Sequence, residues 1–523
     1  MTAVTRRGFL AGSMVTASAA LPGWVAPAAA LAAPSARIAD PFTLGVASGD
    51  PAPDGVVLWT RLAPDPLADD GRGGMPDLEI PVQWQVATDE GFRNVVRSGR
   101  VDARSEHAHS VHVEVSGLRP GRDYFYRFRV RREISPVGRT RTAPGTGARL
   151  SSLAFAFASC QRFPSGFYTA YRDMADQELD FVVHLGDYLY EGGDQGGLGR
   201  GHLPSREITT LADYRVRHAQ YRTDPNLQAA HAAFPWIVTW DDHEVDNNYA
   251  GAEADPDAPP EQFLARRAAA YRAYFEHLPL RRSSVPRGPD ALLFRRLTFG
   301  DLAEFNVLDT RQFRDDQPDC AGQKVTDGYC EPALDPARTM LGREQRRWLF
   351  GGLGNSGARW NILAQQILFA QKDNKPALDE AEYVGGGDQW DGYKAERDAI
   401  LGFLAESRVP NPIVLTGDWH RNAVYDLKAD FSDPDSATLG VEFVGTSISS
   451  GGDQAHPVTS YEDPDDPHER FLNTNRGYVL CDLTGERWRS RFRIVSTVSA
   501  PQAVASTLET FLVEDGRPGA RRS

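Results

Sequence analysis

The chain has 523 residues, of which 41% are hydrophobic and 10% aromatic, and its formal net charge is −14. This length exceeds one ordinary hydrophobic core, so we expect at least two domains, and the composition excludes a disordered protein. Nucleic-acid binding without sequence preference needs lysine and arginine to displace the counterions of the phosphates. The acidic charge therefore predicts no nucleic-acid partner.

Residues 1–32 are predicted to form a twin-arginine export signal. Arg6 and Arg7 lie in the stretch Thr-Arg-Arg-Gly-Phe-Leu at residues 5–10, small apolar residues follow, and Ala-Leu-Ala at 30–32 is a small-x-small cleavage pattern. No later run approaches the roughly 20 apolar residues that span a bilayer. We therefore expect a secreted monomer, exported after folding, without a transmembrane segment.

Residues 38–145 are predicted to form an all-β domain. Segments at 55–60, 82–86, 110–115 and 124–130 have the composition of strands, and turns rich in Gly, Pro and Asp separate them. Residues 117–126 resemble part of a fibronectin type III domain. We predict a fibronectin- or immunoglobulin-like β-sandwich that is structural or shields the active site.

Residues 150–510 are predicted to form an α/β domain whose strands end in polar side chains. Apolar segments at 153–158, 181–185, 236–240, 303–308, 412–416 and 441–444 alternate with helical stretches such as 261–276 and 391–406. The carboxyl ends of parallel strands are where α/β proteins hold ligands. The side chains that follow these strands include Cys160, Asp187, Tyr190, Asp241, Asp242, His243, Arg311, Asp418 and His420.

This set of side chains favours a mixed metal centre. The thiol of Cys160 and the phenol of Tyr190 suit a ferric ion, because a cation of high charge deprotonates both. The surplus of carboxylate oxygens, with an amide from Asn247 or Asn248, suits Ca²⁺. We therefore predict Fe³⁺ and Ca²⁺ as cofactors. Two cations that share Asp187 would bind a phosphate and activate a water molecule as the nucleophile.

The motifs together resemble the alkaline phosphatase D (PhoD-like) family of metallophosphoesterases, which includes secreted phospholipase D enzymes and wall-polymer phosphodiesterases. The resemblance spans the chain after the export signal. It rests on Ser-Cys-Gln at 159–161, Gly-Asp-x-x-Tyr at 186–190, Trp-Asp-Asp-His-Glu at 240–244 and Gly-Asp-Trp-His at 417–420. It implies a β-sandwich followed by a metallophosphoesterase domain with the αββα arrangement.

The resemblance also implies roles for individual residues. Iron would be held by a set in which Asp187 bridges to calcium: Cys160, Asp187, Tyr190 and His420. Asp242 takes the place of a metal-binding asparagine of the wider superfamily. His243 takes the place of the imidazole that stabilises the transition state or protonates the leaving alkoxide. Further calcium ligands would come from Asp241, Asp242, Asn248 and Asp418.

Two departures from the wider superfamily pattern match the iron–calcium variant. Residues 362–366 offer only amides where a histidine ligand is usual, and Cys160 replaces the usual first aspartate. Arg162 and Arg311 are predicted to bind the substrate phosphate, with pairing to local carboxylates as the alternative for both. Cys320 and Cys330 lie in a polar loop and are predicted to form a disulfide.

We therefore predict a secreted, metal-dependent phosphoesterase that hydrolyses phosphodiesters, in the manner of phospholipase D, together with some monoesters. Phospholipids and wall polymers are the candidate substrates. Two alternatives stay open at this point. One is a plain alkaline phosphomonoesterase that scavenges phosphate, and the other is an extracellular binding protein whose metals are structural.

Overall fold

A computed structural model describes residues 40–254, 258–374, 382–384, 387–461 and 463–523. The expected export signal at residues 1–32 lies outside these ranges, whereas every predicted site residue lies inside them. Within the described ranges, no helix is both long and apolar enough to cross a membrane.

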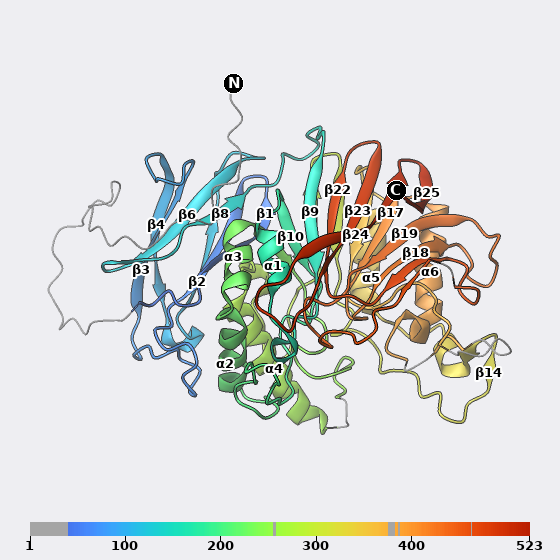
Figure 1. The fold of residues 1–523 in the computed structure, drawn as a ribbon, viewed down its shortest axis with the longest axis horizontal. Helices are drawn as coiled ribbons and strands as arrows, with labels where there is room; N and C mark the ends of the chain where they lie inside the picture. Colours follow the sequence, from blue (N-terminus) through green and yellow to red (C-terminus); the bar gives the residue numbers. More distant parts are fainter. Residues whose placement is uncertain (1–39, 255–257, 375–381, 385–386, 462) are drawn as a thin grey trace.

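Two large sheets form the middle of the molecule (Figure 1). Within the described residues, the first sheet has ten strands in the order β25 (Arg517–Arg522), β24 (Ala505–Glu514), β23 (Arg487–Val495), β22 (Gly477–Leu483), β9 (Leu153–Ala158), β10 (Phe181–His184), β11 (Pro235–Val238), β1 (Val46–Ala52), β2 (Gly55–Arg61) and β5 (Ser110–Val115). The second has eight, in the order β12 (Arg295–Phe299), β13 (Ala303–Val307), β16 (Trp360–Ala364), β17 (Pro412–Thr416), β19 (Thr438–Val444), β18 (Asn422–Lys428), β21 (Glu469–Asn473) and β20 (Thr459–Ser460). Strands β9, β10, β11 and β1 run parallel in the first sheet, as do β13, β16, β17 and β19 in the second.

Successive side chains of a strand point to opposite faces of its sheet. In the first sheet, the two faces pack against two different apolar clusters. In β9, Phe155 and Phe157 enter an apolar layer between the two sheets, whereas Ala156 and Ala158 pack on the helical side. In the layer between the sheets, the ring of Phe305 from β13 meets that of Phe155 edge-on, with centroids 5.2 Å apart. The predicted mixed α/β class is therefore confirmed.

Helices cover the two outer faces. Those packed on the first sheet are α1 (Thr169–Ala175), α2 (Leu211–Arg222), α3 (Pro225–Ala233) and α4 (Pro260–His277). Those packed on the second sheet are α5 (Gly342–Leu353) and α6 (Lys394–Glu406). The resulting layers are helix, sheet, sheet and helix.

The N-terminal strands divide between two sheets. A separate sheet at one end of the molecule holds β4 (Val95–Ala103), β3 (Ile80–Ala87), β6 (Asp123–Val130) and β7 (Glu133–Ile134), with β8 (Gly138–Arg141) also paired to β6 (Figure 1). Strands β1, β2 and β5 instead extend the ten-stranded sheet, because Ser48 and Gly49 pair in parallel with Pro235 and Trp236 of β11. The two groups share one apolar core. A self-contained fibronectin- or immunoglobulin-like sandwich is not confirmed, and the boundary near residues 145–150 stays a prediction.

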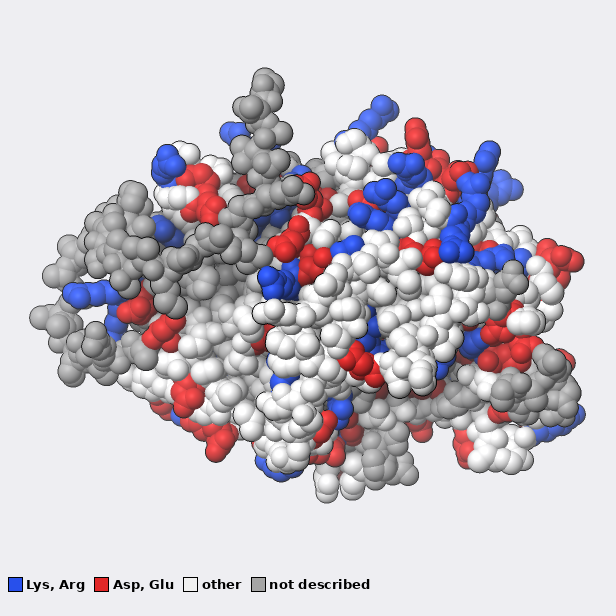
Figure 2. Space-filling view, in the orientation of Figure 1, with Lys and Arg blue, Asp and Glu red and all other residues white. Residues whose placement is uncertain are grey.

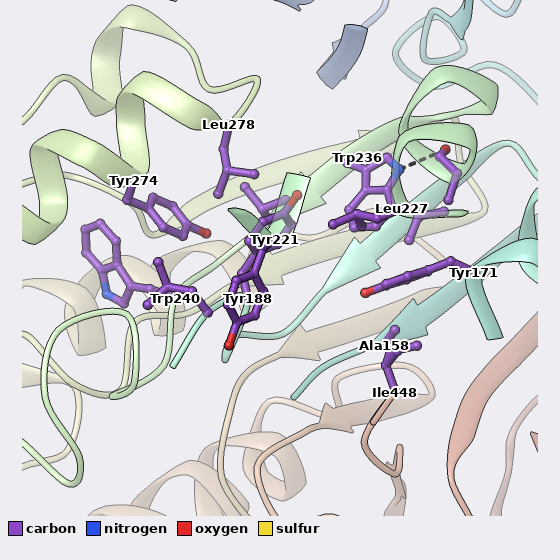
Figure 3. Packing of buried hydrophobic residues seen from close by; sticks show 14 of the residues in the cluster. Ala158, Tyr171, Tyr188, Tyr221, Leu227, Trp236, Trp240, Tyr274, Leu278 and Ile448 are labelled. Carbon is purple, nitrogen blue, oxygen red and sulfur yellow. Dashed lines mark hydrogen bonds between the residues drawn. The ribbon is translucent and has the colours of Figure 1, made fainter. Parts of the chain in front are cut away.

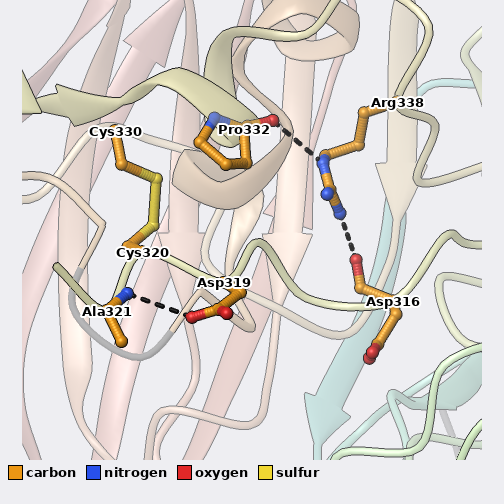
Figure 4. The surroundings of a disulfide bond; sticks show 7 residues. All are labelled: Asp316, Asp319, Cys320, Ala321, Cys330, Pro332 and Arg338. Atoms are coloured by element: carbon orange, nitrogen blue, oxygen red, sulfur yellow. Dashed lines mark hydrogen bonds between the residues drawn. A yellow bond between two sulfur atoms is a disulfide. The ribbon is translucent and has the colours of Figure 1, made fainter. Parts of the chain in front are cut away.

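The predicted disulfide joins Cys320 and Cys330, whose Cα atoms are 5.6 Å apart (Figure 4). It closes a loop that contains the short hairpin of β14 (Val325–Thr326) and β15 (Tyr329–Cys330). Beside it, the Asp319 carboxylate accepts the N–H of Ala321 at 3.1 Å. Cys481 lies in β22 and is fully buried.

Aromatic side chains pack behind the strand ends that carry the candidate ligands (Figure 3). Trp236 of β11 stacks on His231 of α3 with ring centroids 3.8 Å apart. Tyr188, from the loop after β10, belongs to the same cluster, and its hydroxyl group lies 2.9 Å from Nε2 of His231. This core anchors the loop that carries Asp187.

On the face seen in Figure 2, lysine and arginine side chains gather over the region of strands β22 to β25, with acidic side chains among them. In β23, both Arg489 and Arg491 contact the Asp482 carboxylate of β22. The charges there are therefore partly balanced at the surface.

Candidate metal centre

The candidate ligands lie on loops that follow strands of both sheets. Cys160 follows β9, Asp187 follows β10, and Asp418 and His420 follow β17. All four have a left-handed backbone, with φ between 52° and 59°. Residues other than glycine rarely adopt this conformation unless the surrounding structure imposes it, and such residues concentrate at functional sites. The packing of the loops thus forces these four side chains into position.

Gly186 lets the loop after β10 lie directly against the loop after β11. Its φ is 105°, and a Cβ atom at this position would lie 2.4 Å from the Cβ atom of Asp241. Any other residue would push these loops apart. This is why glycine precedes Asp187.

The structure brings the predicted ligands together in three overlapping clusters, each with ligand atoms within 4.8 Å of one another. The clusters are Cys160 with Asp187 and His420, Asp187 with Asp242 and His243, and Asp241 with Asp242 and Asp418. Asp187 and Asp242 each belong to two of them. The shared carboxylates can bridge neighbouring cations.

Tyr190 joins the cluster that contains the thiol. Its hydroxyl group donates to Oδ2 of Asp187 at 2.7 Å and lies 3.1 Å from Nε2 of His420. Ser450 donates to the same hydroxyl oxygen at 2.8 Å. The phenol therefore faces the same space as the thiol, the imidazole and the first carboxylate.

Arg311 occupies the middle of the acidic side of the site and is fully buried. Its Nε donates to Asp241, and its Nη1 lies 2.7 Å from Oδ1 of Asp388. Its Nη2 is 3.7 Å from a carboxylate oxygen of both Asp242 and Asp418, and within the described residues it has no hydrogen-bond partner. Arg311 thus pairs with local carboxylates through Nε and Nη1 and keeps its Nη2 amino group free.

His243 is oriented by Glu191. Its Nδ1 lies 2.7 Å from Oε2 of Glu191, whose other oxygen accepts the N–H of Asn247 at 3.0 Å. Its ring lies over that of Tyr190 with centroids 4.1 Å apart. Burial acts to lower the pKa of His243, but the carboxylates around it, Glu191 first, raise that pKa well above its ordinary value. Glu191 therefore both orients His243 and favours its protonated form.

Glu244 fastens the two acidic loops to each other. Its Oε2 accepts the N–H groups of Asp187 at 3.0 Å and Asp241 at 2.8 Å, and its Oε1 accepts that of Tyr188 at 2.6 Å. Residues that orient metal ligands in this way commonly tune the site nearly as much as the ligands themselves. Burial raises the pKa of Glu244 to about 7.

The protein alone disfavours negative charge at this site. Burial raises the pKa values of the Cys160 thiol and the Tyr190 phenol well above their ordinary values, and Asp187 adds to both shifts. Burial and then Asp388 raise the pKa of Asp418 to about 6. Burial also lowers the pKa of His420 to about 3, which leaves a neutral imidazole. Cations would reverse the penalty on the thiolate, the phenolate and the carboxylates.

Unsatisfied oxygens give an independent test of whether the residues fit a metal. Oδ1 of Asp187 and Oδ2 of Asp241 are buried, and among the described residues neither has a hydrogen-bond partner. Buried carboxylate oxygens are normally hydrogen-bonded or bound to a cation. The donor set and these two atoms therefore fit metal ions.

Two predicted site residues are placed differently. The side chain of Arg162 is 35% exposed and pairs with Asp194 at 2.7 Å, in agreement with the alternative of pairing to a local carboxylate. Asn248 contacts the site through its backbone, whose N–H donates to Oδ2 of Asp242 at 2.7 Å. A role for its side-chain amide stays a prediction.

Several residues of the site were given no role from the sequence: Glu191, Glu244, Asp388, Gln389 and Ser450. Glu191 directly follows Tyr190, and Glu244 is the last residue of the motif at 240–244, so their positions offered a signal. Asp388, Gln389 and Ser450 carry no such signal. They reach the site through loops distant in sequence, as when Gln389 donates to Oδ2 of Asp418 at 2.8 Å.

Comparison with known proteins decides the family. The family model described as PhoD-like phosphatase matches residues 155–492, and the model of its N-terminal domain matches residues 27–144. The chain belongs to the PhoD-like phosphatase family. Alkaline phosphatase D of Bacillus subtilis (strain 168) is 50% identical over 489 residues, which cover 92% of this chain and 82% of that protein. A solved structure of PhoD matches with a TM-score of 0.86 and 50% identity, covering 94% of this chain and 93% of that one.

Membership of the PhoD-like phosphatase family confirms the resemblance seen in the motifs. It also confirms that the chain is an enzyme, a hydrolase of the phosphatase class. The alternative of a protein that only binds is therefore set aside. PhoD-like phosphatases depend on metal, in agreement with the three ligand clusters, whereas the comparisons leave the metals and the roles of single residues untested.

Proposed function

We propose that this PhoD-like phosphatase is an exported phosphoesterase that hydrolyses phosphodiesters, as phospholipase D does, and also phosphomonoesters, with Fe³⁺ and Ca²⁺ as its cofactors. The observation that carries the proposal is the sharing of Asp187 and Asp242 among three ligand clusters. Shared carboxylates are typical of sites in which two or more cations act on one phosphate.

The donor types support these two metals. Fe³⁺ would be held by the sulfur, phenol, imidazole and carboxylate of Cys160, Tyr190, His420 and Asp187. Ca²⁺ would be held by oxygens of Asp187, Asp241, Asp242, Asn248 and Asp418. When bound, the cations would offset charge on the phosphoryl oxygens and lower the pKa of a water molecule.

The chain's own residues would supply the remaining chemistry. Glu191 holds His243 in place and favours its protonated form, so His243 can protonate the departing alcohol. The free Nη2 of Arg311 can donate to a phosphoryl oxygen, because its other nitrogens are already held by Asp241 and Asp388. Arg162 already pairs with Asp194 through Nη2, so a role in binding phosphate would have to fall to its other nitrogens or break this pair.

A plain phosphomonoesterase is the second candidate, because the relative at 50% identity is named alkaline phosphatase D. The two functions differ in whether the site accepts a second ester group. Phospholipids and wall polymers are the candidate diesters. The proposal also includes that the protein is exported and acts as a monomer.

One set of measurements tests the proposal. Elemental analysis of the purified protein should find iron with calcium, and a visible absorption band should report a phenolate bound to iron. Bis(4-nitrophenyl) phosphate and 4-nitrophenyl phosphate should both be hydrolysed, EDTA should abolish both activities, and added Ca²⁺ should restore them. Zinc alone would refute the ligand assignment, and turnover of the monoester only would favour the second candidate.

A further inference from the structure

The loop between β17 and β18 carries two side chains that the ligand clusters do not use. Asp418 and His420 are candidate ligands, whereas Trp419 between them and Arg421 after them are not. Trp419 is partly exposed and packs by its ring on the apolar cluster beneath α5 and α6, with Tyr425 at a centroid distance of 6.3 Å. An indole held in this way presents a rigid flat surface beside the candidate metal centre.

Arg421 lies over this surface. Its guanidinium carbon is 4.9 Å from the Trp419 ring centroid, and its side chain is exposed. Within the described part of the chain, no carboxylate forms an ion pair with it. A guanidinium stacked on a ring keeps the N–H groups at its edge available for a carboxylate or phosphate. Arg421 thus offers an uncompensated charge.

A second arginine adds to the positive charge at this place. Arg476 is buried and donates from Nη1 to the carbonyl oxygen of His420 at 2.7 Å and from Nε to that of Gly452 at 2.8 Å. No ion pair with a carboxylate is formed by Arg476 in the ranges that the structure describes. Arg476 thus contacts the residue that precedes Arg421, and two arginines without a carboxylate ion pair at this place, in a chain of net charge −14, favour a bound anion.

A chain of contacts links this positive region to the proposed proton donor. His420 precedes Arg421 and approaches the hydroxyl group of Tyr190 at 3.1 Å, and the centroid of the Tyr190 ring lies 4.1 Å from that of His243. The same loop also reaches the carboxylates around Arg311, because Asp418 lies 3.7 Å from Nη2 of Arg311. Trp419 and Arg421 therefore belong to a loop that contacts both parts of the site, and a leaving group that takes its proton from His243 can extend towards them.

We infer that Trp419 and Arg421 form the leaving-group subsite for a phosphodiester whose departing alcohol carries a negative charge of its own. The inference rests on the proposed phosphodiesterase function and adds the class of substrate. In the reaction, the water oxygen bonds to phosphorus, the bond from phosphorus to the alcohol oxygen breaks, and a proton passes to that oxygen. Trp419 contacts the body of the alcohol, and Arg421 pairs with its anionic group.

Two matched diesters test the subsite with the full chain carrying its metals. Methyl 4-nitrophenyl phosphate has a neutral leaving phenol, and methyl 3-carboxy-4-nitrophenyl phosphate adds one carboxylate to that phenol. We expect Arg421→Gln to lower kcat/KM for the carboxylate substrate about fivefold to tenfold, the scale of one partly solvated charge pair. Its kcat/KM for the neutral substrate should change less than twofold, and high salt should weaken the wild-type preference.

The control is Arg343→Gln, which removes an exposed positive charge from α5. It should leave the ratio of the two kcat/KM values unchanged. Trp419→Phe should keep part of the preference, and Trp419→Ala should lower kcat/KM for both diesters. An equal loss for both diesters in Arg421→Gln, or no loss for either, would overturn the subsite. A wild-type enzyme that turns over 4-nitrophenyl phosphate but neither diester would instead show that the proposed diesterase function is wrong, and the subsite with it.

Discussion

Glu244 gives the sharpest test of how the ligand loops are held. Its carboxylate accepts the backbone N–H groups of Asp187, Tyr188 and Asp241 at 2.6–3.0 Å. In Glu244→Gln, the amide oxygen can replace Oε2 and keep the bonds to Asp187 and Asp241. The amide NH₂ group then faces the N–H of Tyr188, which loses its acceptor. An unsatisfied buried group of this kind costs about 1–3 kcal/mol.

This loss should appear as weaker metal binding, because Tyr188 lies between the glycine turn and the candidate ligand Tyr190. Substitution of a residue that orients ligands lowers metal affinity or activity about 10- to 100-fold, equivalent to roughly 1.4–2.7 kcal/mol. That range agrees with the cost of one unsatisfied N–H group. We therefore expect Glu244→Gln to release iron and calcium at 10- to 100-fold lower chelator concentration, measured by elemental analysis after equilibrium dialysis.

Glu396→Gln is the matched control. Glu396 is likewise buried and accepts backbone N–H groups, from Met340 and Leu341, but it lies in α6 and joins none of the ligand clusters. This variant should change thermal stability without changing metal retention. The reasoning fails if Glu244→Gln keeps its metals as well as Glu396→Gln does and differs from wild type only in stability.

Three further perturbations test other parts of the site and core. His243→Ala should keep the metals and lower kcat about 10²- to 10⁴-fold, the usual contribution of a general acid–base group; unchanged turnover would remove His243 from the mechanism. Cys160→Ser should lose iron and its visible absorption band, whereas full iron occupancy would reduce Cys160 to a packing role. His218 is fully buried in α2, and burial lowers its pKa to about 3 from an ordinary value of 6.5. The unfolded chain takes up this proton below pH 6.5, and the folded chain does not until about pH 3. As the pH falls across this window, His218 alone lowers the free energy of unfolding by about 1.4 kcal/mol per pH unit. His218→Phe should flatten that decline in denaturant titrations between pH 6.5 and 4.5, and an identical slope in both proteins would contradict the assignment.

Local sequence patterns were sufficient for the strands that carry the ligands. The apolar segments at 153–158 and 412–416 match β9 and β17 at both ends, and the helix expected at 261–276 lies within α4. These elements bury runs of apolar residues, so their period and composition are visible without knowledge of the fold.

Long-range pairing was not visible in the same way. Strand β1 belongs to the ten-stranded sheet only because Ser48 and Gly49 meet Pro235 and Trp236, and nothing in residues 46–52 specifies that partner. Helix α2 was missed because its buried face contains Arg215, Arg217 and His218, which have no apolar period.

In the candidate site too, some residues could be predicted from local sequence and others depend on long-range contacts. Cys160, Asp187, Asp242 and His420 follow strands directly, and the sequence brought all of them into one hypothesis. The carboxylate of Asp388 reaches Arg311 through a loop distant in sequence. Whether Arg311 pairs with an acid or with a phosphate depends on such contacts, which only the folded chain defines.

The pairing of β9 with β22 has a consequence for synthesis of the protein. β9 lies between β10 and β22, and β22 begins only at Gly477, long after β9 in the chain. A nascent chain that has released β9 to β11 from the ribosome still has one unpaired edge on β9, the strand that leads to Cys160. Unpaired edges of this kind invite aggregation. The loop that carries Cys160 can therefore reach its final form only after β22 has been synthesised.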